Sequence, residues 1–263
     1  MPSSRGQGHS RGHNSFLEEF LRQHPEQIQT QTQTERQVSP SSLLYVQTDV
    51  TVEYYSESLH PGLQALRRID HVFANVGIRP TSNLLEEVSE EHPGKGEWEE
   101  ILAPPELRII NLNLLGVINT IRLGVYYLRR SCRRHGHGDS NRNTNTSALQ
   151  SLVLTAPASS FQIFSAADYT VAKHGVLGIL RGLVDDLQAR AQSQTDGGAR
   201  VRLNAIVPSW TATGIVPRDV LAAIGVAVQE PEVVARSVVM LFNDGRRHGE
   251  VLYSWGGEYA EIT

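Results

Sequence analysis

The 263-residue chain has little cysteine, no excess of basic residues and no long uninterrupted hydrophobic run. Its one cysteine, Cys132, excludes an intrachain disulfide and a zinc site built on several thiolates, so we expect a reducing, cytoplasmic location. A formal net charge of −4 leaves no broad basic surface for nucleic acid. No apolar stretch of the ~18 to 20 residues that cross a bilayer is evident, nor a secretory signal. We therefore expect a soluble protein with no nucleic-acid or membrane partner.

The first 41 residues differ in composition from the rest of the chain. They are rich in Gly, His, Ser and Arg and continue into the polar repeat QIQTQTQTERQ at 27–37. Such a segment buries little apolar surface, so we predict a disordered or partly helical leader over 1–41. The remaining residues, 42–263, are enough for one large domain.

Short apolar runs alternate with helical patterns through 42–263. Strands are predicted at 43–49, 70–77, 151–157, 201–208 and 249–257, and helices at 52–68, 107–130, 166–191 and 231–242. A polar, basic segment without periodicity, 133–147, predicts a surface loop. This alternation predicts an α/β fold with a doubly wound parallel sheet.

Tyr169 and Lys173 stand four residues apart on the second long predicted helix, so their side chains project from one face. An ammonium beside a phenol favours the phenolate and lowers the tyrosine pKa from ~10 toward the range of a general acid or base. The spacing alone also arises by chance, so it needs support from the rest of the chain.

Five short motifs supply that support. They are, in chain order, DVT at 49–51, ANVG at 74–77, NLNLLGV at 111–117, YTVAKHGVLG at 169–178 and NAIVPSWTATG at 204–214. From about residue 43 to the C-terminus the chain thereby resembles the short-chain dehydrogenase/reductase family. The sequences of several motifs are similar to those of members from fungal specialised metabolism. The resemblance implies a Rossmann-like sheet, NADP or NAD as cofactor with NADP favoured, a ketone or secondary alcohol as small-molecule substrate, and a homo-oligomer.

The resemblance also implies roles for particular residues. Tyr169 would exchange the proton with the substrate oxygen, Lys173 would bind the nicotinamide ribose and lower the tyrosine pKa, and Asn113 would hold a water in a proton relay. Further cofactor contacts are implied, each with a plain turn or surface role as the alternative: Asp49 at the adenine, Asn75 beside the adenosine ribose, Arg108 near the cofactor, and Thr211 and Thr213 at the nicotinamide carboxamide.

Two features of the family pattern are missing. The family's catalytic serine stands 12 or 13 residues before the tyrosine, where this chain has Pro157 and Ala156; the nearest hydroxyls are on Ser159 and Ser160. The strand and TGxxxGxG turn that hold the cofactor pyrophosphate also have no counterpart, because the glycines of GQGHSRG at 6–12 are wrongly spaced. We therefore predict that the first βα unit is missing, together with the residues that select NAD or NADP.

Three hypotheses follow from this mixture. The chain is an active NAD(P)-dependent oxidoreductase, or a non-catalytic or non-redox protein of the same fold that serves as a binding subunit or cyclase-like helper, or a truncated gene model of an ordinary enzyme. No metal site is expected, because His135 and His137 lie two apart in a polar loop without carboxylate support.

Overall fold

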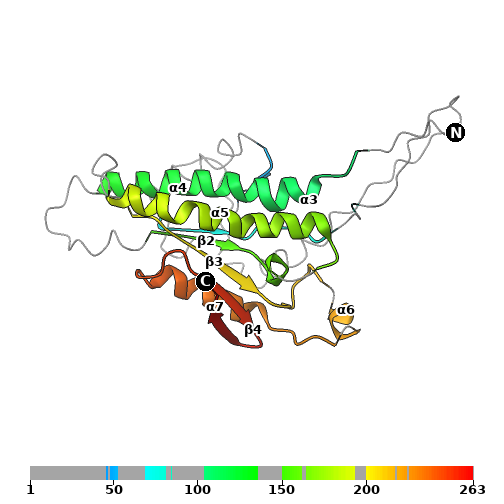
Figure 1. Cartoon of the computed structure of the whole chain (residues 1–263). Coiled ribbons are helices and arrows are strands. Elements are labelled where there is room, and N and C mark those ends of the chain that lie inside the picture. The colour runs from blue at the N-terminus through cyan, green and yellow to red at the C-terminus, as the bar shows by residue number, and fades with distance from the viewer. Residues whose placement is uncertain are drawn as a thin grey trace, which may run out of the picture.

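The computed structural model describes residues 46, 48–52, 69–80, 84, 104–135, 150–161, 164–192, 200–216, 218–223 and 225–262 (Figure 1). The predicted leader over 1–41 lies outside these residues, and so does the segment where the first βα unit was expected to be missing. Of the predicted helix at 52–68 only residue 52 is described, and it lies in a bend. Of the predicted strand at 43–49, residues 46, 48 and 49 are described, and none of them lies in a strand.

The described strands form one sheet in the order β1–β2–β3–β4–β5. Their bounds are β1 His71–Ala74, β2 Ser151–Thr155, β3 Arg202–Pro208, β4 Val251–Trp255 and β5 Glu258–Glu261. The first four are parallel to one another, as predicted, and β5 runs antiparallel to β4. The sequence analysis missed β5, which returns through Gly256 and Gly257 at φ angles of 54° and 101°, where glycine is favoured.

The predicted helix at 107–130 is interrupted near its start. It comprises α3 Arg108–Ile110, a π-helical turn η2 Asn111–Leu115 and α4 Gly116–His135. Because α4 runs on to His135, the loop predicted from residue 133 starts later than expected. The other long helix, α5 Ala167–Gln192, and α7 Pro231–Asn243 match their predictions, whereas the short α6 Arg218–Ala223 and the 3₁₀ turn η4 Ala158–Ser160 were not predicted.

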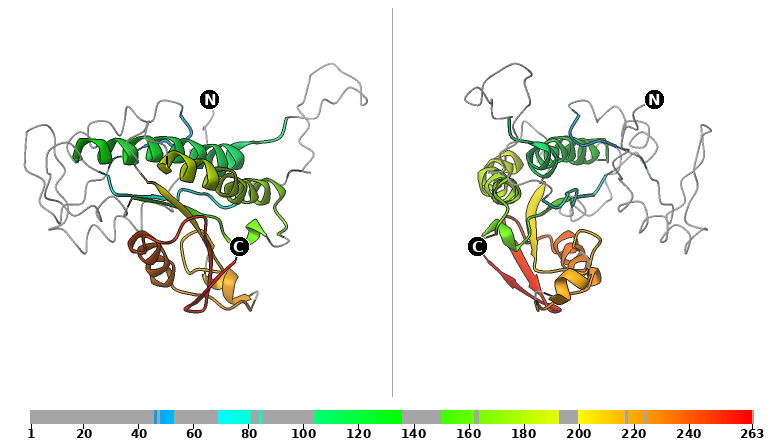
Figure 2. Two further views of the ribbon diagram at one scale, coloured as in Figure 1. Left: turned by 60° about the vertical axis from the view of Figure 1, so that its left-hand side comes forward. Right: turned by 90° about the vertical axis from the view of Figure 1, so that its right-hand side faces the viewer.

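Helices cover both faces of the sheet. Helices α4 and α5 lie side by side on one face and α7 lies on the other (Figures 1 and 2). Successive residues of β2 show the two layers, since Leu152 and Leu154 belong to the core under α4 and α5 while Val153 packs with Val238 and Leu241 of α7. A parallel strand buried on both faces needs apolar residues at every position, which explains the continuous run in β2.

The segment Arg108–Ser131 is, by length and composition alone, apolar enough to cross a membrane, which the sequence inspection did not anticipate. In the structure, Ile109, Val117 and Leu128 on its inner side are buried against the rest of the fold. About a third of the most apolar window, 33%, is buried in the structure, and a single such helix is weak evidence for a membrane span.

A buried arginine joins β3 to the end of α7. Arg202 is fully buried, and its Nη1 donates to the carbonyl oxygens of Leu241, Asp244 and Arg247 at 2.8, 2.8 and 3.2 Å, while Nη2 donates to that of Phe242 at 2.8 Å. Burial lowers the pKa of the Arg202 guanidinium, yet arginine remains charged in proteins. The cation therefore satisfies carbonyls that the helix end leaves unpaired and complements the helix dipole.

We expect Arg202→Met to lower the free energy of unfolding by about 3 to 5 kcal/mol, because the apolar side chain leaves several buried carbonyls without donors. Urea unfolding followed by circular dichroism measures this change. The matched control, Arg200→Met, alters an exposed arginine two residues earlier and should change the free energy of unfolding by less than about 0.5 kcal/mol. Equal midpoints for the two variants would contradict the capping role.

Candidate active site

Polar residues, among them the predicted Asn75 and Thr211, lie at or after the carboxyl ends of the parallel strands. Asn75 comes directly after β1, Thr155 ends β2, and Thr211 lies in the loop after β3. Because parallel strands end at one edge of the sheet, these residues lie along the same edge, which is where open α/β sheets bind their ligands. The Thr155 hydroxyl donates to Asn75 Oδ1 at 2.8 Å and so links the ends of β1 and β2.

Tyr169 and Lys173 lie one turn apart near the start of α5. Lys173 is 4% exposed, and its Nζ lies 5.9 Å from the centroid of the Tyr169 ring. Burial raises the pKa of Tyr169 to about 12 and lowers the pKa of Lys173 to about 8. The predicted lowering of the tyrosine pKa is therefore not found in the protein alone, because the desolvation of the phenolate outweighs the attraction of the ammonium at this distance.

Asn113 is fully buried in the π-helical turn η2, where its side chain holds the loop after β1. Its Oδ1 accepts from the backbone N–H of Ile78 at 2.8 Å, and its Nδ2 donates to the Ile78 carbonyl at 2.9 Å. A Cβ atom on Gly77 would lie 3.2 Å from Lys173 Nζ and 3.3 Å from Asn113 Oδ1. The absence of a side chain at Gly77 thus allows the loop after β1 to pack closely against η2 and α5. The π-helical form of η2 is itself frequent at functional sites.

The Lys173 ammonium forms no hydrogen bond with any residue that the structure describes. A buried ammonium without acceptors is costly, and such groups in native proteins are normally paired. The position beside Gly77 therefore suits a ligand that brings oxygen acceptors, such as the hydroxyls of a ribose.

The remaining sequence-predicted residues lie apart from this pair. Asp49 is exposed, and its Oδ1 accepts from the backbone N–H and hydroxyl of Thr51 at 2.9 and 2.7 Å, which lowers the pKa of Asp49. Arg108 is exposed at the start of α3. Thr213 is exposed in the loop after β3, and Thr211 is half-buried there. The structure thus brings Asn113 and Lys173 together beside Tyr169, and among the described residues it shows no hydrogen bond from Asp49 or Arg108 to them.

Two aromatic side chains that the sequence analysis did not consider lie near Tyr169. The Phe164 ring lies 5.8 Å from the Tyr169 ring and 6.5 Å from that of Trp210, centroid to centroid. Phe164 precedes α5 and Trp210 follows β3, so only the fold brings them together. Phe164 contributes to the burial of the phenol, which raises its pKa.

The segment after β2 carries Ala156 and Pro157, the two residues at the spacing where the resemblance places the serine. Ala156 is fully buried, and its N–H donates to the carbonyl of Ile206 at 2.9 Å, which continues the pairing of β2 with β3. Ser159 and Ser160 follow in η4, which packs against α5, and are 8% and 2% exposed. Neither hydroxyl has a hydrogen-bond partner among the described residues.

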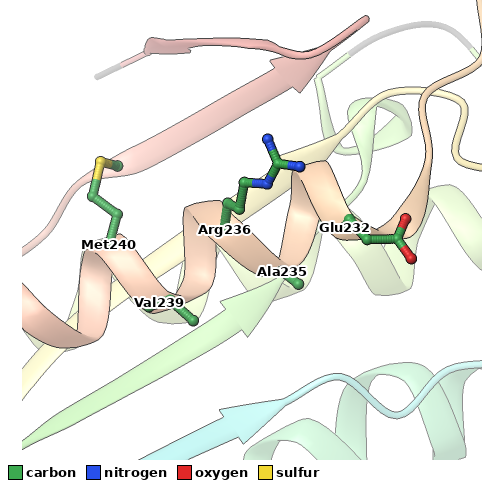
Figure 3. A pocket seen from close by; sticks show the side chains of 5 residues that line it. All are labelled: Glu232, Ala235, Arg236, Val239 and Met240. Carbon is green, nitrogen blue, oxygen red and sulfur yellow. The ribbon is translucent and has the colours of Figure 1, made fainter.

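No group of three or more potential metal ligands occurs within the described ranges, and His137 lies outside them. A groove does run along the outer side of α7, lined by Glu232, Ala235, Arg236, Val239 and Met240 (Figure 3). Because α7 covers the opposite face of the sheet from α5, this groove is remote from Tyr169 and Lys173.

The parallel sheet, the two helix layers and the polar carboxyl edge define a Rossmann-like α/β protein. Solved structures share this fold: a 3-oxoacyl-[acyl-carrier protein] reductase with bound NAD from Brucella melitensis gives a TM-score of 0.56 at 20% identity, covering 82% of this chain and 71% of its own. A variant of ElxO with NADPH bound gives 0.53 at 17% identity, covering 78% and 73%. No protein-family profile matches the chain.

The chain is also similar in sequence to curated proteins of one family. The short-chain dehydrogenase/reductase ascJ of Acremonium egyptiacum is 33% identical over 217 residues, which are 82% of this chain and 64% of that protein. The short-chain dehydrogenase/reductase prx7 of Penicillium rubens is 29% identical over 204 residues, 74% of this chain and 61% of that protein. Over the matched residues the chain is similar to members of the short-chain dehydrogenase/reductase family. It spans less than two thirds of the length of these relatives.

The lowered pKa of Lys173 can be measured directly, because Lys95 and Lys173 are the only lysines in the chain. After reductive ¹³C-methylation, we expect one of the two side-chain NMR signals to titrate near pH 8, since burial disfavours the charged form. Lys173→Arg assigns that signal by removing it. Titration of the Lys173 signal at pH 10 or above would contradict its burial.

Proposed function

We propose that this protein is an NAD(P)-dependent oxidoreductase that interconverts a ketone and a secondary alcohol. The observation that carries the proposal is the half-buried Tyr169 with the buried Lys173 beside the Asn113 clamp, at the edge of the sheet where ligands bind. Similarity to members of an oxidoreductase family supports it, as do the solved structures of the same fold, which hold NAD and NADPH.

Several residues of the chain fit a nicotinamide cofactor. Lys173 would donate to the ribose hydroxyls, where its buried ammonium gains the acceptors that the described residues do not provide. Thr211 and Thr213 would contact the carboxamide, and Asn75 and Asp49 would lie toward the adenosine. When bound, the reduced nicotinamide supplies the hydride for the substrate carbonyl carbon.

Tyr169 would supply the proton. Because burial raises its pKa to about 12, the phenol is protonated at neutral pH and is ready to donate to the carbonyl oxygen as negative charge develops there. Lys173, with a pKa of about 8, remains charged at pH 7 and stabilises the phenolate that results. The pair is therefore better prepared for ketone reduction than for alcohol oxidation.

A second candidate function is a non-redox protein of the same fold, a binding subunit or cyclase-like helper. The buried Ala156 favours it, because a methyl group stands where the family places the hydroxyl that binds the reacting oxygen. In that protein Tyr169 and Lys173 would shape a binding site without transferring a proton.

The cellular setting is also a proposal. The resemblance to fungal specialised-metabolism proteins supports a step in a biosynthetic pathway, with NADP favoured as cofactor, in the cytoplasm. Exposed apolar residues of η2, α4 and α5, including Leu115, Ile118, Tyr126 and Val171, support a homo-oligomer formed through these helices.

Titration with NADH and NADPH, followed by nicotinamide fluorescence, tests the proposal at its first step. We expect micromolar to submillimolar binding of at least one cofactor, and cofactor-dependent reduction of a ketone. Tyr169→Phe should lower the reduction rate by ~10²- to 10⁴-fold, because the proton donor is lost, while the dissociation constant for the cofactor changes little. Absence of binding at millimolar cofactor would exclude the redox function and favour the second candidate.

The unpaired hydroxyls of η4 offer a test of how the chain compensates for Ala156. If Ser159 or Ser160 donates to the substrate oxygen, its replacement by alanine should slow reduction by ~10²- to 10³-fold. The same change should leave the free energy of unfolding equal or raise it by about 1 kcal/mol, because a buried unpaired hydroxyl is removed.

Ser151→Ala is the matched control for this pair of variants. Ser151 is also fully buried with an unpaired hydroxyl, but it stands at the opposite end of β2. Its replacement should have a similar effect on stability and none on the rate. Unchanged rates for both η4 variants would show that neither serine takes the donor role.

A further inference from the structure

Gln229 is a buried amide just before α7 that no sequence motif singles out. It is 3% exposed, and its Nε2 donates to Thr211 Oγ1 at 3.2 Å and to Ser254 at the end of β4, with 3.1 Å to both the carbonyl oxygen and the hydroxyl. A carbonyl oxygen can only accept a hydrogen bond. The contact with the Ser254 carbonyl therefore shows that the amide nitrogen of Gln229, and not its oxygen, points toward Ser254. The Gln229 Oε1 is buried and meets no donor among the described residues.

The backbone of Gln229 holds the same loop from the same side. Its N–H donates to the Trp210 carbonyl and its own carbonyl accepts from the Ala212 N–H, both at 2.9 Å. The Ser209 N–H donates to the Ser254 carbonyl, also at 2.9 Å. Gln229 and Ser254 together therefore hold three peptide units of the loop after β3, and Thr211 lies between the two that Gln229 holds.

These bonds also decide what the Thr211 hydroxyl can do. It donates its only proton to the Ser209 carbonyl at 2.9 Å, and one of its lone pairs accepts from Gln229 Nε2. The second lone pair is the one hydrogen-bonding position left on the oxygen. Thr211 is thereby held as an acceptor, suited to a ligand that brings an N–H donor.

We propose that Gln229 is a positioning residue for the nicotinamide carboxamide, acting through Thr211. The proposal rests on the proposed function, and it adds that Gln229 aligns the Thr211 hydroxyl as an acceptor for the carboxamide NH₂. The amide fulfils this role because it reaches the loop and the end of β4 at once, so that two chain segments far apart in the sequence hold one hydroxyl in a single orientation.

The test compares a full cofactor with a fragment that lacks nicotinamide. Gln229→Met keeps the length of the side chain and removes the amide. We expect it to weaken NADPH binding roughly five- to tenfold, the value of about one hydrogen bond, and to leave the dissociation constant of 2′-phospho-ADP-ribose unchanged. NADH and ADP-ribose serve as the pair if the wild type binds NADH. A merely structural role would change both dissociation constants or neither.

Two further variants complete the design. Thr211→Val should give the same selective loss, and the double variant should lose no more than either single one, because both changes remove one interaction. This variant also keeps the proposal open to refutation if Gln229→Met does not fold. Gln192→Met, at an exposed glutamine at the end of α5, should change neither dissociation constant.

The outcomes separate this proposal from the proposed function. A selective loss of affinity for the full cofactor in both Gln229→Met and Thr211→Val supports it. Equal weakening of cofactor and fragment, or no change in either, overturns it and leaves the oxidoreductase function intact. If wild-type protein binds neither cofactor nor fragment, the proposed function fails and the role of Gln229 fails with it.

Discussion

Every part of the candidate site depends on the parallel pairing of β1 to β4. Parallel strands all end at one edge, so the residues that follow them are brought together regardless of their separation in the sequence. The link from Thr155 to Asn75 joins residues 80 positions apart, and the clamp from Asn113 to Ile78 joins residues 35 apart. The sheet is stable only because α4 and α5 cover one face and α7 the other, so the helices that carry Tyr169, Lys173 and Asn113 are also those that the core requires.

Polar groups without partners gather at this same edge. The hydroxyls of Ser159 and Ser160 and the Gln229 Oε1 are buried there without a hydrogen-bond partner among the described residues. The Lys173 side chain is 4% exposed, and its ammonium forms no hydrogen bond with a described residue. Each such group costs free energy, and native proteins hold few of them. Their placement after the parallel strands suits a polar ligand, whereas Arg202, at the opposite end of β3, satisfies its buried charge entirely within the protein.

The raised pKa of Tyr169 shows why a motif alone does not establish the chemistry. The spacing of Tyr169 and Lys173 predicts that the ammonium stabilises the phenolate. Burial acts in the opposite direction on both groups, since it disfavours each charged form, and Phe164 contributes to the burial of Tyr169. Which influence prevails depends on surroundings that the fold assembles, and a bound ligand adds to them.

Local properties of this protein could be predicted from its sequence. The long helices, the strands β1 to β4 and the placement of Tyr169 and Lys173 on one face of α5 follow from residue periodicity, which acts over a few neighbouring residues. Tertiary structure alone decided the rest. The π-helical turn at Asn113 is a one-residue change in backbone hydrogen bonding and has no composition of its own. Gln229 meets Thr211 and Ser254 across 18 and 25 residues, and Arg202 meets α7 across about 40, because contacts made by chain folding are specified by the whole core and not by any local pattern.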